Sequence, residues 1–202
     1  YSLAQIYHAR DSSLNRTQNA LRAQGSLEAI DNFAFVDFGS TISQETISAF
    51  GTQSSSDSSF NANRTEVATY LLSPYVRGKV GDWANYQARY TRQASRSKSA
   101  LARDQDIASI TAMLSGDSQR RAFSWSVDAS HVELDYNTGR LFESDRVRAV
   151  LGYPVTPQLQ LAVIPGWESN NFASVSGEKE GHATYGGRIN WNPSNRTAVS
   201  AL

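Results

Sequence analysis

Length, composition and charge already restrict the class of this protein. The chain has 202 residues, of which 40% are hydrophobic, and its mean hydropathy is −0.46. The 19 basic and 19 acidic residues cancel to a formal net charge of zero, so nothing favours nucleic acid as a partner. Because cysteine is absent, disulfide frameworks, thiolate metal ligands and cysteine nucleophiles are excluded. Uninterrupted apolar runs are only a few residues long, so we expect no transmembrane helix.

The two ends of the chain suggest an incomplete protein. The chain opens at Tyr1, without the methionine and basic segment that begin a signal peptide. At the other end, residues 196–202 read as a strand that stops midway. We therefore expect one domain over residues 1–202 that is truncated at both ends.

The N-terminal part carries a weak strand pattern. Apolar and polar residues alternate weakly over 1–10 and 14–24, and a strand is expected around 33–43. Between them, residues 26–32 fit either a turn or a bent strand. These first strands are the least well defined in the sequence.

From residue 83 onward the alternation becomes regular. In 83–91, alanine and tyrosine take every second position, and Asn85, Gln87, Arg89 and Thr91 take the others. The segments 108–114, 122–130, 144–153 and 183–191 repeat this pattern. The stretches are about nine to fourteen residues long, and a tilted membrane-spanning strand needs about nine to eleven. We expect about eleven strands with one apolar and one polar side each.

The connections between these strands alternate in length. Long polar connections are expected at 44–63, 94–105 and 169–181, and one of medium length at 135–140. Short ones rich in Gly, Asp, Asn and Pro are expected at 78–82, 115–118, 154–157 and 192–195. Outer-membrane β-barrels combine long extracellular loops with short periplasmic turns. Only Pro74 and Pro165, which fall inside expected strands, count against the pattern.

These patterns predict an all-β fold, an antiparallel up-and-down transmembrane β-barrel in a Gram-negative outer membrane, with lipid as its partner. The residues expected to face lipid are Tyr86, Tyr90, Phe123, Trp125, Val127, Val147, Leu151, Tyr153, Tyr185, Ile189 and Trp191. Those expected to face the lumen are Arg77, Asn85, Gln87, Arg89, Asp128, Arg146, Arg148, Gln160, Arg188 and Asn190. Trp167, with Tyr90, Tyr153 and Trp191, fits an aromatic girdle at the membrane interface, although aromatic residues are also common in ordinary strands.

No residue pattern indicates catalysis, a cofactor or a metal site. His8, His131 and His182 are far apart and lack metal-ligand spacing, and His131 falls on the lipid-side or interfacial stripe of its strand. Glu178 and Glu180 alternate with His182 but sit in a polar loop, where solvated charges are expected. Nucleotide-binding and serine-hydrolase motifs are missing from the sequence. We therefore expect no enzyme activity and no cofactor.

Several phrases resemble the outer-membrane β-barrel proteins associated with PEP-CTERM/exosortase exopolysaccharide gene clusters, which overlap the β-barrel porin 2 group. The phrases are FAFVDFGSTISQ at 33–44, LSPYVR at 72–77, ARYT at 88–91, LGYPVTPQL at 151–159 and NWNPSNRT at 190–197. The resemblance implies the architecture and the location, and it supplies no catalytic residues. Members of this family are longer than the present chain.

Three functions fit these expectations. The first is a porin-like or structural barrel, linked by the resemblance to exopolysaccharide export or surface assembly, with polysaccharide or small solutes as partners. Its inward arginines either line a water-filled pore or form an Arg–carboxylate network that holds the barrel together. The second is a soluble, secreted β-sandwich binding module whose apolar stripes form an internal core. The third is a barrel enzyme of the outer-membrane lipase or protease type, which requires Ser or Asp beside a histidine at the lumen rim.

Overall fold

The computed structural model describes residues 1–6, 16–48, 50–51, 63–99, 104–116, 123–137, 139, 141–172, 180–194 and 197–201. The strands are β1 (Ser2–Ile6), β2 (Arg16–Ile30), β3 (Ala34–Thr46), β4 (Arg64–Val80), β5 (Ala84–Ser97), β6 (Gln105–Gly116), β7 (Ser124–Tyr136), β8 (Leu141–Thr156), β9 (Leu159–Phe172), β10 (Glu180–Ser194) and β11 (Thr197–Ala201). Within these ranges, no helix is long and apolar enough to cross a membrane.

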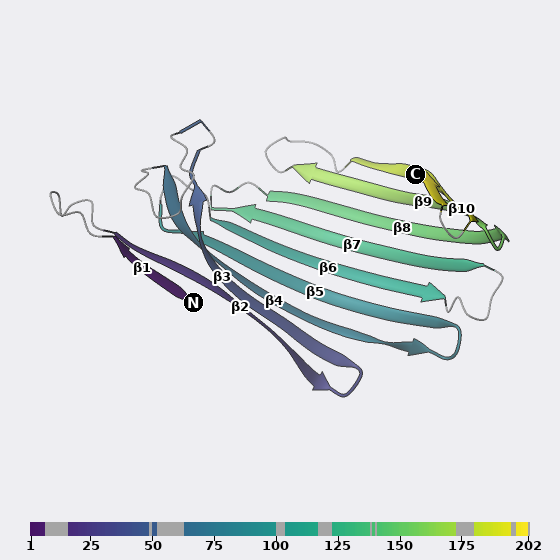
Figure 1. The fold of residues 1–202 in the computed structure, drawn as a ribbon, viewed down its shortest axis with the longest axis horizontal. Helices are drawn as coiled ribbons and strands as arrows, with labels where there is room; N and C mark the ends of the chain where they lie inside the picture. The colour runs from purple at the N-terminus through teal and green to yellow at the C-terminus, as the bar shows by residue number, and fades with distance from the viewer. Residues whose placement is uncertain are drawn as a thin grey trace.

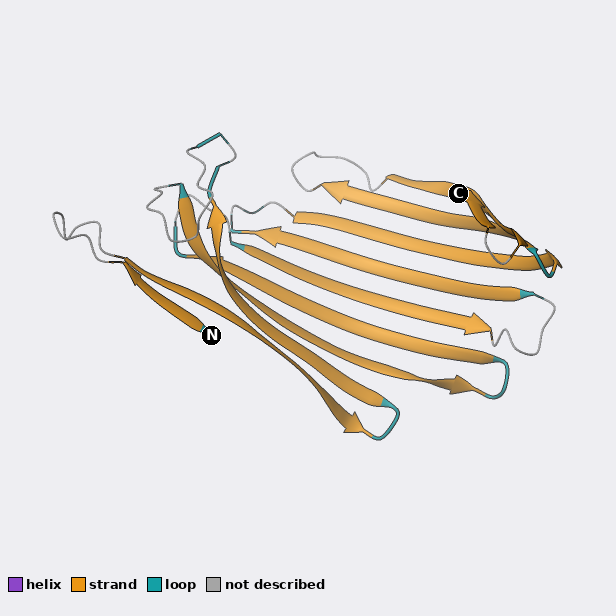
Figure 2. Ribbon diagram, in the orientation of Figure 1, coloured by secondary structure: helices purple, strands orange, loops and turns teal. Residues whose placement is uncertain are grey.

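All the strands belong to one curved antiparallel sheet (Figure 1). Each strand pairs with the next in the chain, so the spatial order is the sequence order from β1 to β11. Among the described residues β1 pairs only with β2 and β11 only with β10, so the sheet is open. Strands account for nearly all of the ordered structure in Figure 2. The expected all-β, antiparallel up-and-down architecture of about eleven strands is therefore confirmed.

The long strands follow from the alternating sequence. From β2 to β10 they range from 12 residues in β6 to 17 in β4. At about 3.3 Å per residue, such strands are roughly 40 to 55 Å long, which exceeds the thickness of a bilayer core. They also continue several residues into the expected long connections, as β5 does to Ser97 and β9 to Phe172. The polar residues of these extensions remain paired with the neighbouring strand because this pairing provides hydrogen bonds for their backbone N–H and C=O groups.

Two local expectations need correction or completion. Residues 26–32 are mostly strand, since β2 continues to Ile30 with a register irregularity after Glu28 and then turns at Asn32, whose φ is 54°. The short connection expected at 115–118 begins later than predicted, because β6 continues to Gly116 and β7 begins at Ser124. Gly116 resembles a turn residue in the sequence but pairs within the ladder.

The two prolines that count against the sequence pattern, Pro74 and Pro165, lie where pairing with one neighbour is interrupted. Pro74 pairs with Val36 of β3, but the β4–β5 register has no pair for it. Pro165 pairs with Tyr185 of β10, but the β8–β9 register likewise omits it. Proline has no N–H to donate, so it fits where the ladder is open on one side.

Aromatic rings cover glycines on neighbouring strands. At each of these glycines an added Cβ would overlap a ring or its hydroxyl group, so the ring lies directly over the backbone. The pairs are Gly25 with Phe38, Gly78 with Tyr86, Gly116 with Trp125, and Gly181 with Trp167. Such pairs shield a glycine that has no side chain of its own and help to fix strand register.

We expect Gly25→Ala to destabilise the sheet, because the new Cβ would lie 2.5 Å from Cζ of Phe38 and displace the ring. The loss should be about 1 kcal/mol, the scale of one cross-strand side-chain pair. Urea unfolding in phospholipid vesicles measures it. The matched control is Gly186→Ala, whose Cβ would meet its nearest neighbour at an ordinary 3.8 Å. Equal stability of the two variants would contradict the role of the Phe38 ring.

Candidate functional site

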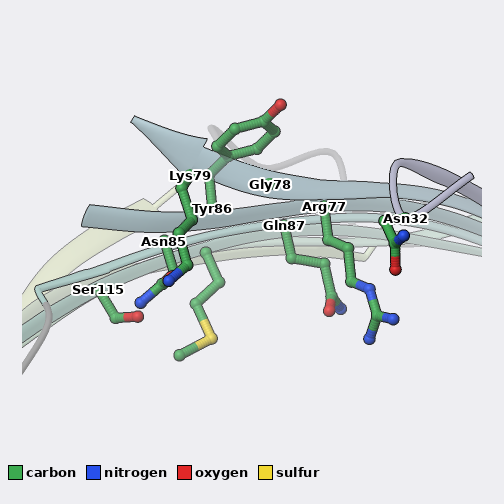
Figure 3. A pocket seen from close by; sticks show the side chains of 9 residues that line it. Asn32, Arg77, Gly78, Lys79, Asn85, Tyr86, Gln87 and Ser115 are labelled. Carbon is green, nitrogen blue, oxygen red and sulfur yellow. The ribbon is translucent and has the colours of Figure 1, made fainter. Parts of the chain in front are cut away.

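The pairing register divides the side chains into two faces. We call the face that carries Arg77, Arg89 and Arg148 the polar face, and the one that carries Tyr86 and Leu151 the apolar face. Every residue expected to face the lumen lies on the polar face. Every strand residue expected to face lipid lies on the apolar face. Phe123 precedes β7 and has no register pair, but it lines a shallow hollow with Leu151 and Tyr153. In Figure 3 the strands curve toward the side of Arg77, and Tyr86 projects to the opposite side.

The apolar face is exposed and does not form an internal core. Among the described residues, Phe35 and Ala84 are the buried hydrophobic ones. Leu151 is 47% exposed, Ile189 49% and Tyr185 93%. In a β-sandwich a second sheet would cover these side chains, but the described strands form a single sheet. The soluble sandwich therefore has no support in this architecture.

In β8, β9 and β10 the apolar face contains a band of equal height. Its outward residues are apolar from Val147 to Val155 in β8, from Leu159 to Trp167 in β9 and from Ala183 to Trp191 in β10. Nine residues rise about 27–30 Å along a strand, and a tilt of about 40° reduces this to a little over 20 Å. Outer-membrane barrels have an apolar band about 25 Å tall.

Polar side chains mark where the band ends toward the connections 47–63, 98–104 and 173–179. On the apolar face Arg92 follows Tyr90, and the buried Ser169 follows Trp167. Ion pairs continue this polar zone: Arg96 with Asp106 at 2.8 Å, Lys98 with Glu66 at 2.7 Å, and His131 with Asp145 at 2.6 Å.

Aromatic side chains lie at both ends of the band. Tyr90 and Trp167 are the last apolar residues before the polar zone. At the opposite end, the rings of Trp83 and Trp125 stack with centroids 5.9 Å apart, and Tyr153 and Trp191 lie at the corresponding ends of β8 and β10. Of these, Tyr90, Tyr153, Trp167 and Trp191 were expected from sequence. The arrangement matches the aromatic girdles of membrane barrels.

Ion pairs and stacked rings connect β3, β4 and β5 on the polar face. The Arg89 guanidinium group donates to Asp37 and to Ser73, both at 2.8 Å, and its Cζ lies 3.9 Å from the ring centroid of Tyr75. Tyr75 stacks on Phe35 at 5.0 Å. Cation–π contacts and charged hydrogen bonds reinforce each other here, since both hold one guanidinium group in a fixed plane.

A second set of ion pairs connects β7, β8 and β9. Arg148 donates to Asp128 at 3.1 Å, and Arg146 donates to Glu168 at 3.2 Å. The amide of Asn170 also donates to Glu168, at 3.0 Å. The predicted polar residues Arg89, Arg146 and Arg148 are thus each paired with a carboxylate, whereas no ion pair joins Arg77 or Arg188 to another described residue.

Several contributors to these networks were missed in the sequence. Asp37, Tyr75 and Lys79 lie on the polar face but were not assigned to it. The segment 33–43 places phenylalanine on both faces, at Phe35 and at Phe38, so its alternation does not reveal which side is polar. For Lys79, the signal was available because it is two residues from Arg77 on the same strand.

The histidines do not form a metal site within the described residues. His131 lies on the apolar side beyond the band, as expected. There its hydrogen bonds to Asp145 and then Glu133 raise the pKa of the imidazole above its ordinary value. His182 pairs in register with Glu168 across β9 and β10. His8 and Glu178 lie outside the described residues.

Comparison with solved structures identifies the architecture. The chain is similar to a loop L8 deletion mutant of OmpT, an outer membrane protein of Vibrio cholerae, with TM-score 0.51 and 12% identity over 85% of this chain and 54% of that one. It is similar to OmpT of the same organism in a trimer form, with TM-score 0.52 and 12% identity over 84% of this chain and 56% of that one. The fold is that of an outer-membrane β-barrel. The chain spans about half the length of these two structures.

At this level of identity the likeness concerns the fold alone. No protein-family model matches the chain, and no curated protein matches it. The resemblance to the PEP-CTERM-associated barrels is therefore supported as far as a general outer-membrane barrel, and the narrower family stays a prediction.

We expect Arg89→Met to destabilise the sheet because Asp37 would lose its charged partner and Tyr75 its stacked cation. The loss should be about 1–2 kcal/mol, the scale of a hydrogen bond between charged groups that is partly exposed to solvent. Unfolding in vesicles measures it, with Arg188→Met as the control. If both variants unfold at the same urea concentration, the Arg89 network does not stabilise the fold.

Proposed function

We propose that this protein is a porin-like barrel of a Gram-negative outer membrane. In this proposal the apolar face contacts lipid and the polar face lines a water-filled channel for small polar solutes. The observation that carries it is the exposed apolar band, close to bilayer thickness, directly behind a face that carries arginines and carboxylates. Charged residues at the lipid face of such barrels cost about 2–4 kcal/mol at the midplane, so their natural place is the lumen.

The location is tested by expressing the complete gene and fractionating the cells. We expect the protein in the outer-membrane fraction, and recovery from the soluble periplasm would overturn the proposal. Planar-bilayer conductance of the purified protein then separates a channel from a barrel with a purely structural role. A link to exopolysaccharide export or surface assembly rests on the family resemblance alone, and a polysaccharide that blocks the conductance would support it.

A neighbouring pair of substitutions tests which face meets lipid. Leu151 lies near the middle of the band on the apolar face, and Val150 is adjacent in β8 but lies on the polar face. We expect Leu151→Arg to cost about 2–4 kcal/mol, because the cation would enter hydrocarbon. Val150→Arg should be tolerated. Folding yield and urea unfolding in vesicles compare the two, and the reverse order would mean that the faces are assigned the wrong way round.

A barrel enzyme is the second candidate, and one contact favours it. His131 lies 2.6 Å from Asp145, and Ser169 is the register partner of Asp145 on the next strand. However, a nucleophilic serine needs the histidine beside it, and here the aspartate stands between the two. Among the described residues, the Ser169 hydroxyl group also has no hydrogen-bond partner. Hydrolysis of ester or peptide substrates that His131→Ala abolishes would establish the enzyme.

A further inference from the structure

A basic hollow lies on the polar face toward the short connections of β4, β5 and β6 (Figure 3). Its volume is about 360 Å³. The polar residues that line it are Asn32, Arg77, Lys79, Asn85, Gln87 and Ser115. None of the described residues that line it is acidic, so its charge comes from two cations.

Register and stacking hold these side chains in place. Arg77 pairs with Gln87 and Lys79 pairs with Asn85, so two cations and two amides lie on one face of adjacent strands. The Cζ atom of Arg77 lies 4.4 Å from the ring centroid of Phe35. A ring contacts the flat side of the guanidinium group and leaves the N–H groups at its edge available to a ligand.

Arg77 in the basic hollow differs from Arg89 in having no carboxylate partner among the described residues. Both arginines stack on a ring of the neighbouring strand, but the N–H groups of Arg89 are occupied by Asp37 and Ser73. Glu28 is the carboxylate opposite Phe35, the ring on which Arg77 stacks, in the β2–β3 register. Glu28 instead accepts a hydrogen bond from the backbone N–H of Asn32. Arg77 and Lys79 therefore form no ion pair with any described carboxylate.

We propose that the basic hollow binds the phosphate or carboxylate group of an anionic solute and makes the channel selective for anions. The inference rests on the proposed channel function and names the solute class for it. Residues two apart on a strand are about 7 Å from each other, so Arg77 and Lys79 line the same hollow, with Gln87 between them in Figure 3. The guanidinium group binds two oxygens at once, and the amides and Ser115 add neutral donors. Cations without a carboxylate partner on the polar face also attract anions to it.

Ion selectivity tests the proposal. The complete protein, its Arg77→Gln and Lys79→Gln variants and the double variant are reconstituted in planar bilayers with a potassium chloride gradient. We expect the parent channel to prefer chloride, each single variant to lower the chloride-to-potassium permeability ratio severalfold, and the double variant to lose the preference. Arg77→Lys should retain most of it, because the charge is kept. Arg96→Gln is the control, since it removes one positive charge from the apolar side.

The outcomes separate this inference from the proposed function. If all variants form open channels with the same selectivity, the proposed anion site in the basic hollow is refuted, and the proposed channel function still stands. A parent protein that does not conduct would overturn the channel, and the hollow is then judged by calorimetric titration of the detergent-solubilised protein with inorganic phosphate. Phosphate binding that requires Arg77 and Lys79 supports the site, and binding that is absent or unchanged in the double variant overturns it. Heat-dependent mobility on gels verifies that each variant is folded.

Discussion

Hydrogen bonding between neighbouring strands is the constraint on which the rest of this structure depends. In the proposed membrane location no water can satisfy a backbone N–H or C=O group, so each must find its partner within the sheet. In a ladder, successive side chains project to opposite faces. The alternating sequence therefore places apolar residues on one face and polar residues on the other. Pro74 and Pro165 respect this constraint, since each lies where the ladder to one neighbour is already interrupted.

The same stacking of an arginine on an aromatic ring occurs twice on the polar face. In each case an arginine stacks on an aromatic ring of the neighbouring strand, at Tyr75 for Arg89 and at Phe35 for Arg77. Where a carboxylate completes the arrangement, the guanidinium group is fully engaged and connects three strands. At Arg77 no ion pair with a described carboxylate forms, and Glu28 instead accepts the backbone N–H of Asn32. In the proposed anion site, one neighbouring side chain therefore separates the structural arginine from the binding one.

The strands are longer than the apolar band, and the excess gives the apolar side a second chemical character. Beyond Tyr90 and Trp167 this side carries Arg92, the Arg96–Asp106 ion pair and His131 with its carboxylate partners. Side chains of this kind require water, so the level at which they begin fixes one boundary of the band. The aromatic residues at that level tolerate both environments because each combines a large ring with a polar tip.

From β5 onward the sequence by itself determined the strands and their two faces, because an alternation of period two directly encodes which side of a strand each residue occupies. For β3 it predicted a strand but not which of its sides is polar. It also located the arginines of β5, β8 and β10. Only the tertiary structure decided which arginines are paired, since Asp37 and Arg89 are 52 residues apart and meet across β4. The tertiary structure likewise decided the role of Gly116. The sequence suggests a turn there, but Gly116 belongs to β6 and the Trp125 ring of the next strand packs over it. These contacts depend on register between strands, and register is a property of the assembled sheet.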